Sequence, residues 1–225
     1  MFEITEKWKQ TYPDSHAGIL VMRDALNPAQ HAELEKRKTA LEEELRTRYA
    51  GLDRAALLRN PILNAYEAYY RRFKKTYHIQ LQLESILFKG KSLPSVAGLV
   101  EAMFMAEMNH LLLTAGHDLD ILHLPLSIDV ASGSESYTLL RGEPQSPKEG
   151  DMMILDQEGI VSSIVYGPDQ RTQITAATRN AVFTVYGPTG ISPQDIERQL
   201  EEIRDNVYVL APEARVEVLE VYAAG

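Results

Sequence analysis

The period of the hydrophobic residues changes near residue 122, and this change most limits the folds open to the chain. Between residues 27 and 114, apolar residues recur at helical spacing. From Leu122 to Val130 they alternate with polar residues, as in a half-buried strand. Further short strands are expected at about 136–140, 151–155, 160–166 and 180–186. Helices followed by a meander of mostly antiparallel strands predict an α+β fold.

Turn and cap residues place the boundaries of the expected elements. Residues 17–22 form a short apolar strand, and Asn27-Pro28 starts a helix that runs to about Tyr49. Pro61 opens a second helix, and a third is expected over about 95–114 with Gly116 as its left-handed stop. Residues 156–159 form a tight hairpin turn. Ser192 caps a helix to about Asn206, and a strand over 215–222 follows.

Length and composition are those of a globular protein. The chain has 225 residues, which is enough to bury a large core. We expect one domain over residues 1–225, with residues 1–60 as an N-terminal strand and helical portion and 61–225 as the main core. The chain contains no cysteine, which excludes disulfides, a thiol nucleophile and cysteine-ligated metal centres. No secretory signal or membrane span is visible, so we expect a cytoplasmic location. We also expect no metal and no cofactor.

Charge is unevenly distributed along the chain. Residues 61–91 carry six Lys or Arg against two acidic residues, whereas residues 92–225 carry seven against twenty. The basic segment is therefore the part of the chain that could attract a nucleic-acid backbone. Its six basic residues are the predicted nucleic-acid contacts: Arg71, Arg72, Lys74, Lys75, Lys89 and Lys91. Alternatively, the residues at the end of the second helix complement the helix dipole.

Two clusters of polar residues are candidates for a ligand site. The apolar run that begins at Val100 ends in His117, Asp118 and Asp120, and residues 171–180 read RTQITAATRN. Alone, the first cluster offers too few ligands for a metal ion. The threonines of the second cluster could bind a ligand or form hydrogen bonds to nearby backbone. Arg171 could form a bidentate hydrogen bond to a planar anion. The predicted ligand-binding residues are Asp118, Asp120, Arg171, Thr172, Thr178 and Asn180.

The order and spacing of these motifs resemble one known domain. Leu93-Pro94, Leu99-Val100-Glu101, residues 116–120, Arg171-Thr172 and residues 178–180 together resemble the B3/B4 domain of the phenylalanyl-tRNA synthetase β subunit. The resemblance is closer to the free-standing proteins built from that domain alone, and it covers roughly residues 60–222. It implies an α+β fold and an editing module, which in the synthetase hydrolyses tyrosine wrongly attached to the phenylalanine tRNA.

The functional residues of that family carry over in part. Asp118 matches the family's aspartate, and Thr172 and Thr178 match its serine and threonine. Phe104 stands at the family's asparagine position, and Ala115 stands at the position of its editing histidine. Pro168-Asp169 lies where the family has a Gly-Gly pair. His117, two residues beyond Ala115, is the candidate catalytic residue that would position water in place of the missing histidine.

Two functions follow from these observations. In the first, the chain binds tRNA or aminoacyl-tRNA and hydrolyses mischarged aminoacyl-tRNA in trans, with Arg171 and Thr172 holding the substrate and residues 71–75 contacting phosphates. Such chemistry depends on positioning and oxyanion stabilisation more than on a strong nucleophile. In the second, the fold is a non-catalytic module that binds an amino acid or another small metabolite. The excess of acidic residues after residue 91 favours the second function. Ala115 at the position of the editing histidine favours it as well.

Overall fold

A four-stranded antiparallel sheet forms the centre of the computed structural model, which describes residues 1–225. Its strand order is β11 (Arg215–Ala223), β2 (His16–Arg23), β10 (Ala181–Gly187) and β3 (Leu113–Asp118). The inner strands β2 and β10 are buried along nearly their whole length. β3 pairs with β10 on one side only, so its other edge is free over most of its length.

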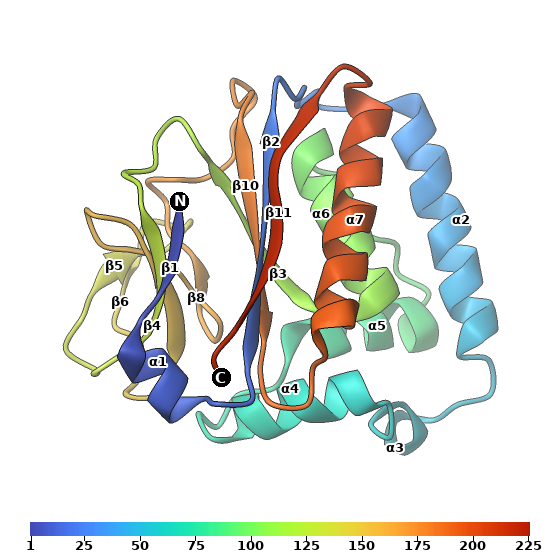
Figure 1. Cartoon of the computed structure of the whole chain (residues 1–225). Coiled ribbons are helices and arrows are strands. Elements are labelled where there is room, and N and C mark those ends of the chain that lie inside the picture. The colour runs from blue at the N-terminus through green and yellow to red at the C-terminus, as the bar shows by residue number, and fades with distance from the viewer.

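Helices cover one face of this sheet in two layers (Figure 1). α6 (Gly98–His110) and α7 (Pro193–Leu210) pack against the strands, and α2 (Ala32–Arg48) packs outside them. α7 comes close to β2 because Gly18 has no side chain. A Cβ there would lie 2.3 Å from Cγ2 of Ile196, which is closer than a real side chain tolerates.

A second sheet lies across the opposite face (Figure 1). Its strand order is β1 (Phe2–Ile4), β4 (Leu126–Val130), β7 (Met152–Leu155), β8 (Ile160–Ser163) and β9 (Gly167–Pro168). Only the β1–β4 pair is parallel. α1 (Glu6–Thr11) follows β1, and β5 (Tyr137–Thr138) and β6 (Pro144–Gln145) form a separate hairpin.

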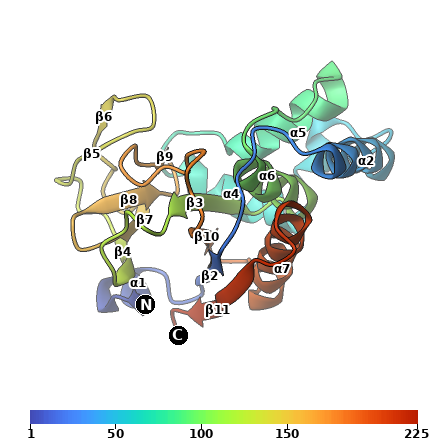
Figure 2. The same ribbon diagram turned by 90° about the horizontal axis from the view of Figure 1, so that it is seen from above.

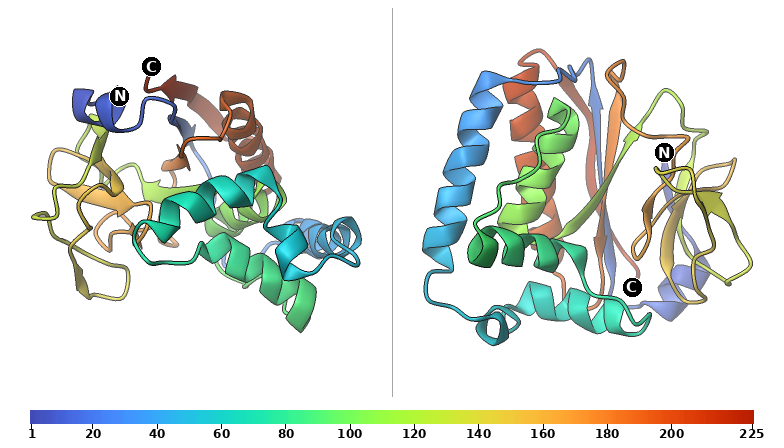
Figure 3. Two further views of the ribbon diagram at one scale, coloured as in Figure 1. Left: turned by 90° about the horizontal axis from the view of Figure 1, so that it is seen from below. Right: turned by 180° about the vertical axis from the view of Figure 1, so that it is seen from behind.

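The remaining helices lie at the lower end of the molecule (Figure 3). They are α3 (Arg54–Leu57), α4 (Pro61–Arg71) and α5 (His78–Lys89). α4 runs beneath the sheets, and the other two lie on the side of the helical layers. One apolar core joins both sheets and the helices, and it includes Trp8, Tyr66 and Phe183, none of which is exposed to solvent. None of the helices combines the length and the apolar composition needed to cross a membrane.

The α+β fold with a mostly antiparallel sheet is confirmed. The tight turn at 156–159 is also confirmed, because Asp156 N–H donates to the Gly159 carbonyl between β7 and β8. Ser192 caps α7 as predicted, since its hydroxyl accepts the Asp195 N–H. These features are fixed by local sequence signals, which is why the sequence predicts them.

The third helix ends earlier than predicted. α6 ends at His110, and Leu111 adopts the left-handed conformation with φ 63°. Gly116 therefore does not stop a helix but lies within β3. The apolar run after His110 is consistent with either a buried helix or a buried strand, and hydrophobic content alone does not distinguish them.

Other boundaries also differ from the prediction. The helix expected from Asn27 begins at Ala32, and the Asn27 side chain instead accepts the Leu99 N–H in the first turn of α6. α5 was not predicted. The strand expected over 122–130 begins at Leu126, and the one expected over 160–166 ends at Ser163. Tertiary contacts, which no sequence window contains, decide each of these boundaries.

Candidate functional site

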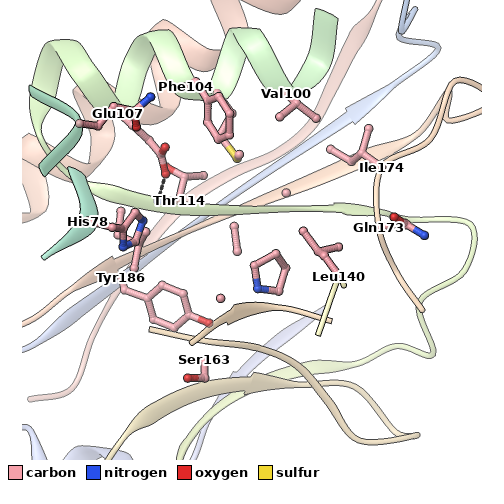
Figure 4. A pocket seen from close by; sticks show the side chains of 17 residues that line it. His78, Val100, Phe104, Glu107, Thr114, Leu140, Ser163, Gln173, Ile174 and Tyr186 are labelled. Carbon is pink, nitrogen blue, oxygen red and sulfur yellow. Dashed lines mark hydrogen bonds between the residues drawn. The ribbon is translucent and has the colours of Figure 1, made fainter. Parts of the chain in front are cut away.

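A cavity of about 300 Å³ lies along the free edge of β3, between α6 and the β8–β9 segment. Figure 2 shows β3 with α6 on one side and β9 on the other. The apolar part of its wall is formed by Val100, Met103, Phe104, Leu140 and Ile174. Polar groups on the wall come from Gln82 and from six residues that Figure 4 labels around the space: His78, Glu107, Thr114, Ser163, Gln173 and Tyr186.

The free edge of β3 presents backbone groups to this cavity. Thr114 N–H donates to Glu107 Oε1 at 2.7 Å, and Asp118 N–H donates to the Thr172 carbonyl at 2.8 Å, both on the side away from β10. Alternate residues of a strand direct their backbone groups to the same edge, so Gly116 N–H also points there. A glycine is required at this position for the packing of Ile174, because a Cβ on Gly116 would lie 2.9 Å from Cδ1 of Ile174. The edge can therefore donate a backbone hydrogen bond to a ligand carbonyl.

Glu107 is the single carboxyl group on the cavity wall. It projects from the last turns of α6, is 3% exposed, and has the Thr114 N–H as its one hydrogen-bond donor (Figure 4). Burial raises the pKa of Glu107 to about 8, because the charged form loses its hydration. The group is consequently protonated for the most part at neutral pH. A carboxyl group with a pKa raised this far marks a candidate functional position.

The wall opposite α6 is held by buried hydrogen bonds. Ser163 Oγ donates to Asp151 Oδ2 at 2.5 Å, and the Tyr69 hydroxyl donates to Asp151 Oδ1 at 2.9 Å. The Tyr186 hydroxyl is bonded to the Ser162 hydroxyl at 2.5 Å. Burial raises the pKa of Asp151 to about 6. These bonds orient the Ser163 and Tyr186 side chains before any ligand arrives.

His117, the predicted catalytic residue, does not line the cavity. Its side chain is fully buried, and Nδ1 lies 2.7 Å from Thr172 Oγ1, which in turn donates to Asp169. Burial lowers the pKa of His117 to about 4, and the Arg171 guanidinium adds to this effect. Its catalytic role stays a prediction, and the burial of the ring argues against it.

The two predicted polar clusters do come together, but they bond to each other. Thr178 Oγ1 donates to Asp118 Oδ2 at 2.6 Å, and the Asn180 amide donates to both Asp120 oxygens at 2.9 Å. With the His117–Thr172 contact, these bonds join the end of β3 to the 171–180 segment. None of these residues lines the cavity. Their ligand-binding role stays a prediction, and the geometry gives them a structural one.

Arg171 is also engaged within the protein. Its two terminal nitrogens donate to Asp156 at 2.9 and 2.8 Å, and Glu158 and Asp169 lie within 3.4 and 3.6 Å of the guanidinium. The two hydrogen bonds to one carboxylate form the bidentate pair for which the geometry of a guanidinium is suited. An anionic ligand would therefore have to displace Asp156.

The six predicted nucleic-acid contacts do not form one patch. Arg72 lies 5.2 to 5.4 Å from the ring centres of Tyr12, Tyr69 and Phe73 and donates to the Tyr12 hydroxyl, which makes it part of an aromatic cluster. Lys75 Nζ lies 5.5 Å from the Tyr166 ring, next to β9 and the cavity. All six are exposed to solvent, and four of them have no such aromatic contact: Arg71, Lys74, Lys89 and Lys91. Lys89 is the last residue of α5, about 16 Å from its first residue at 1.5 Å per residue, and Lys91 follows just beyond the helix.

The sequence analysis missed the residues that shape the cavity. Glu107 had a signal, because it is a lone acidic residue in the strongly apolar segment Ala102–Met108 of a helix expected to be buried. Ser163 and Tyr186 had none, since each sits in an ordinary strand pattern. Only the packing of β8 and β10 around β3 brings them to one wall.

Comparison with known proteins agrees with this architecture. The B3/4 domain family model matches residues 64–206, which is more than half of the chain. An N-terminal fragment of the phenylalanyl-tRNA synthetase β subunit from Pyrococcus horikoshii has a similar structure, with a TM-score of 0.50 and 12% sequence identity. The match covers 96% of this chain and 50% of that fragment, so the chain spans about half of the fragment's length. No curated protein sequence matches the chain. The chain belongs to the B3/4 domain family.

Proposed function

We propose that the chain binds the aminoacyl end of an aminoacyl-tRNA in the cavity at the β3 edge. One observation carries the proposal: the cavity is lined by the segments that give the chain its likeness to the synthetase domain. Val100, Phe104, Ala115 and Pro168 all lie on its wall. The space of about 300 Å³ suits an amino-acid side chain with its acyl group. A tRNA partner fits a cytoplasmic location.

Hydrolysis in trans is the finer form of this proposal. The wall offers Gly116 N–H for an ester carbonyl oxygen, and such a donor stabilises the negative charge that develops when water attacks. The wall offers no activated nucleophile. A serine is usually activated by a histidine that accepts its proton, whereas the Ser163 hydroxyl donates to the Asp151 carboxyl group. Water would therefore be the attacking group.

A non-catalytic module for an amino acid or small metabolite is the second candidate. Ala115, on the cavity wall at the position of the family's editing histidine, supports it. One assay separates the two candidates. tRNA specific for phenylalanine is charged with tyrosine, and release of tyrosine and retention of the charged tRNA are both measured. Retention without release supports binding alone.

Filling the cavity is expected to weaken binding. Val100 is half-buried on α6, so Val100→Phe directs a ring into the cavity with little disturbance of the core. We expect affinity for the aminoacyl-tRNA to fall about tenfold or more, equivalent to about 1.4 kcal/mol. Val218→Phe on β11 is the matched control, because Val218 is also half-buried but lies outside the cavity. Equal affinities of the wild type and Val100→Phe would place the site elsewhere.

The lysines near the cavity are expected to contact phosphates more than those at the far end of α5. Each lost phosphate contact lowers the slope of log affinity against log salt by about 1. The Lys74→Gln/Lys75→Gln double variant should therefore lower the slope for tRNA binding by about 2, and Lys89→Gln/Lys91→Gln should leave it near the wild-type value. Filter binding over a series of salt concentrations measures both. The reverse order would move the phosphate path to the other end of α5.

A further inference from the structure

The carboxyl group of Glu107 is unpaired in a cavity whose one basic side chain is His78. No Lys or Arg lines the wall, and no ion pair involves Glu107. Oε1 accepts the Thr114 N–H, while Oε2 has no hydrogen bond and is not sealed inside the protein. A buried carboxyl group that keeps one oxygen open to a cavity is costly for folding alone. It is useful where a ligand supplies the missing partner.

The groups around Glu107 are neutral or far from becoming cations. Tyr66 and Tyr70 of α4 and Tyr77 at the start of α5 face it, and burial raises the pKa of each phenol further above its ordinary value. Desolvation lowers the pKa of His78 to about 4, so its ring is neutral at pH 7, and its Nδ1 lies 3.4 Å from the Tyr70 hydroxyl. From β10, Tyr186 contributes a phenol, and from α7, Gln199 donates to Leu112 and Thr114. None of these side chains supplies a counter-charge to Glu107.

We propose that Glu107 forms an ion pair with the ammonium group of the ligand, so that the cavity selects an amine-bearing acyl group. This inference rests on the proposed function and identifies the ammonium group as the feature of the aminoacyl group that the site recognises. An ammonium group donates a charge-assisted hydrogen bond to Oε2 and stabilises the ionised carboxylate. The apolar part of the ligand then lies against Val100, Phe104 and Ile174 on the same wall.

The same arrangement disfavours a free amino acid. A free amino acid carries a carboxylate beside its amine, and the wall has no cation to receive it. An ester or amide of the same amino acid has a neutral carbonyl at that place, which Gly116 N–H can bind. The cavity is therefore matched to an amino acid already linked through its carboxyl group, as in aminoacyl-tRNA.

Isothermal titration with three probes tests this assignment. They are phenylalaninamide, N-acetylphenylalaninamide and phenylalanine, where the amide stands for the ester and the acetyl group removes the charge. We expect the wild type to bind phenylalaninamide at least about tenfold more tightly than either other probe. In Glu107→Gln, which keeps the shape and the acceptor for Thr114 N–H, the preference over N-acetylphenylalaninamide should disappear.

Proton release gives an independent readout that a structural role would not move. Phosphate and Tris have different ionisation enthalpies. The difference between the binding heats measured in the two buffers at pH 7 therefore gives the number of protons that binding releases. Because Glu107 must lose its proton to pair with the ammonium group, the wild type should release up to one proton and Glu107→Gln close to none. Glu43→Gln, at an exposed carboxylate without an ion pair on α2, should behave as the wild type.

The outcomes separate this inference from the proposal on which it rests. Equal wild-type affinity for phenylalaninamide and its N-acetyl derivative would overturn the role of Glu107, while the binding itself would still support the cavity. Unchanged selectivity and proton release in Glu107→Gln would overturn it in the same way. If no probe bound and Val100→Phe left aminoacyl-tRNA binding intact, the cavity itself would be the wrong site.

Discussion

Glu107→Gln is expected to make the protein more stable at neutral pH, by about 3 kcal/mol in free energy of unfolding. The carboxyl of Glu107 has a pKa of about 8 in the folded chain, against an ordinary value of 4.5. Between these values the unfolded chain ionises and the folded chain does not. A raised pKa of this kind contributes stability that is complete below about pH 4.5 and is lost as the pH rises toward about 8. Glutamine has no such dependence.

Urea unfolding at a series of pH values measures this effect. The difference in stability between Glu107→Gln and the wild type should be small at about pH 4.5 and grow to its full size at about pH 8. Groups elsewhere titrate in both proteins, so their contributions cancel in the difference. Glu43→Gln serves again as the control, and its difference should stay flat across the range. A flat difference for Glu107→Gln would mean that the folded protein solvates or pairs this carboxyl group.

A stabilising substitution at Glu107 would also bear on its role. Residues that serve binding are often poorly placed for folding, and replacing them trades function for stability. Loss of amine selectivity together with a gain in stability is therefore the combined result expected of a ligand-binding carboxyl group. A residue retained only for the fold would give the opposite result, a loss of stability on substitution.

The order of the elements could be predicted because each pattern is local. Alternation after residue 122, the cap at Ser192 and the turn at Asp156 are signals contained within a few residues, and the structure confirms them. The end of α6 could not be predicted this way. Helix and buried strand share an apolar sequence, and the change at Leu111 depends on the pairing of β3 with β10, seventy residues later.

The candidate site shows the same division. The sequence placed polar residues at the end of β3 and in the 171–180 segment, and these do meet, as in the Asp118–Thr178 bond. Sequence patterns do not reveal that such residues satisfy each other and leave nothing for a ligand. Conversely, the sequence marks Glu107 only as a lone acidic residue in an apolar helix, and its buried surroundings and unpaired oxygen are what make it a candidate. Residues that act through a lack of partners are recognised from three-dimensional contacts.

His117 is expected to make the fold sensitive to acid. Its pKa is about 4 in the folded chain, below the ordinary 6.5, because burial disfavours the charged ring. For a base with a lowered pKa, stability is complete above about pH 6.5 and is lost as the pH falls toward about 4. The unfolded chain takes up a proton in this range and the folded chain does not. The loss amounts to about 3 kcal/mol at the lower limit.

The variant His117→Asn tests this dependence, because an amide can replace Nδ1 in the contact with the Thr172 hydroxyl but does not titrate. Its stability should fall less steeply than that of the wild type between about pH 6.5 and pH 4. His123→Asn is the control for the loss of an exposed imidazole, since the His123 side chain is 60% exposed. An equally steep loss in His117→Asn would assign the acid sensitivity to other groups, such as Asp156 in its bonds to Arg171.

The same variant decides between the two roles of His117. A catalytic histidine must reach the substrate and exchange a proton near neutral pH. His117 meets neither condition in this structure, because its ring is fully buried, lies off the cavity wall and has a pKa of about 4. If tyrosine is released from the mischarged tRNA at all, His117→Asn should release it at a rate close to that of the wild type under conditions where both are folded. A large loss of rate in a folded variant would instead restore His117 as a catalytic residue.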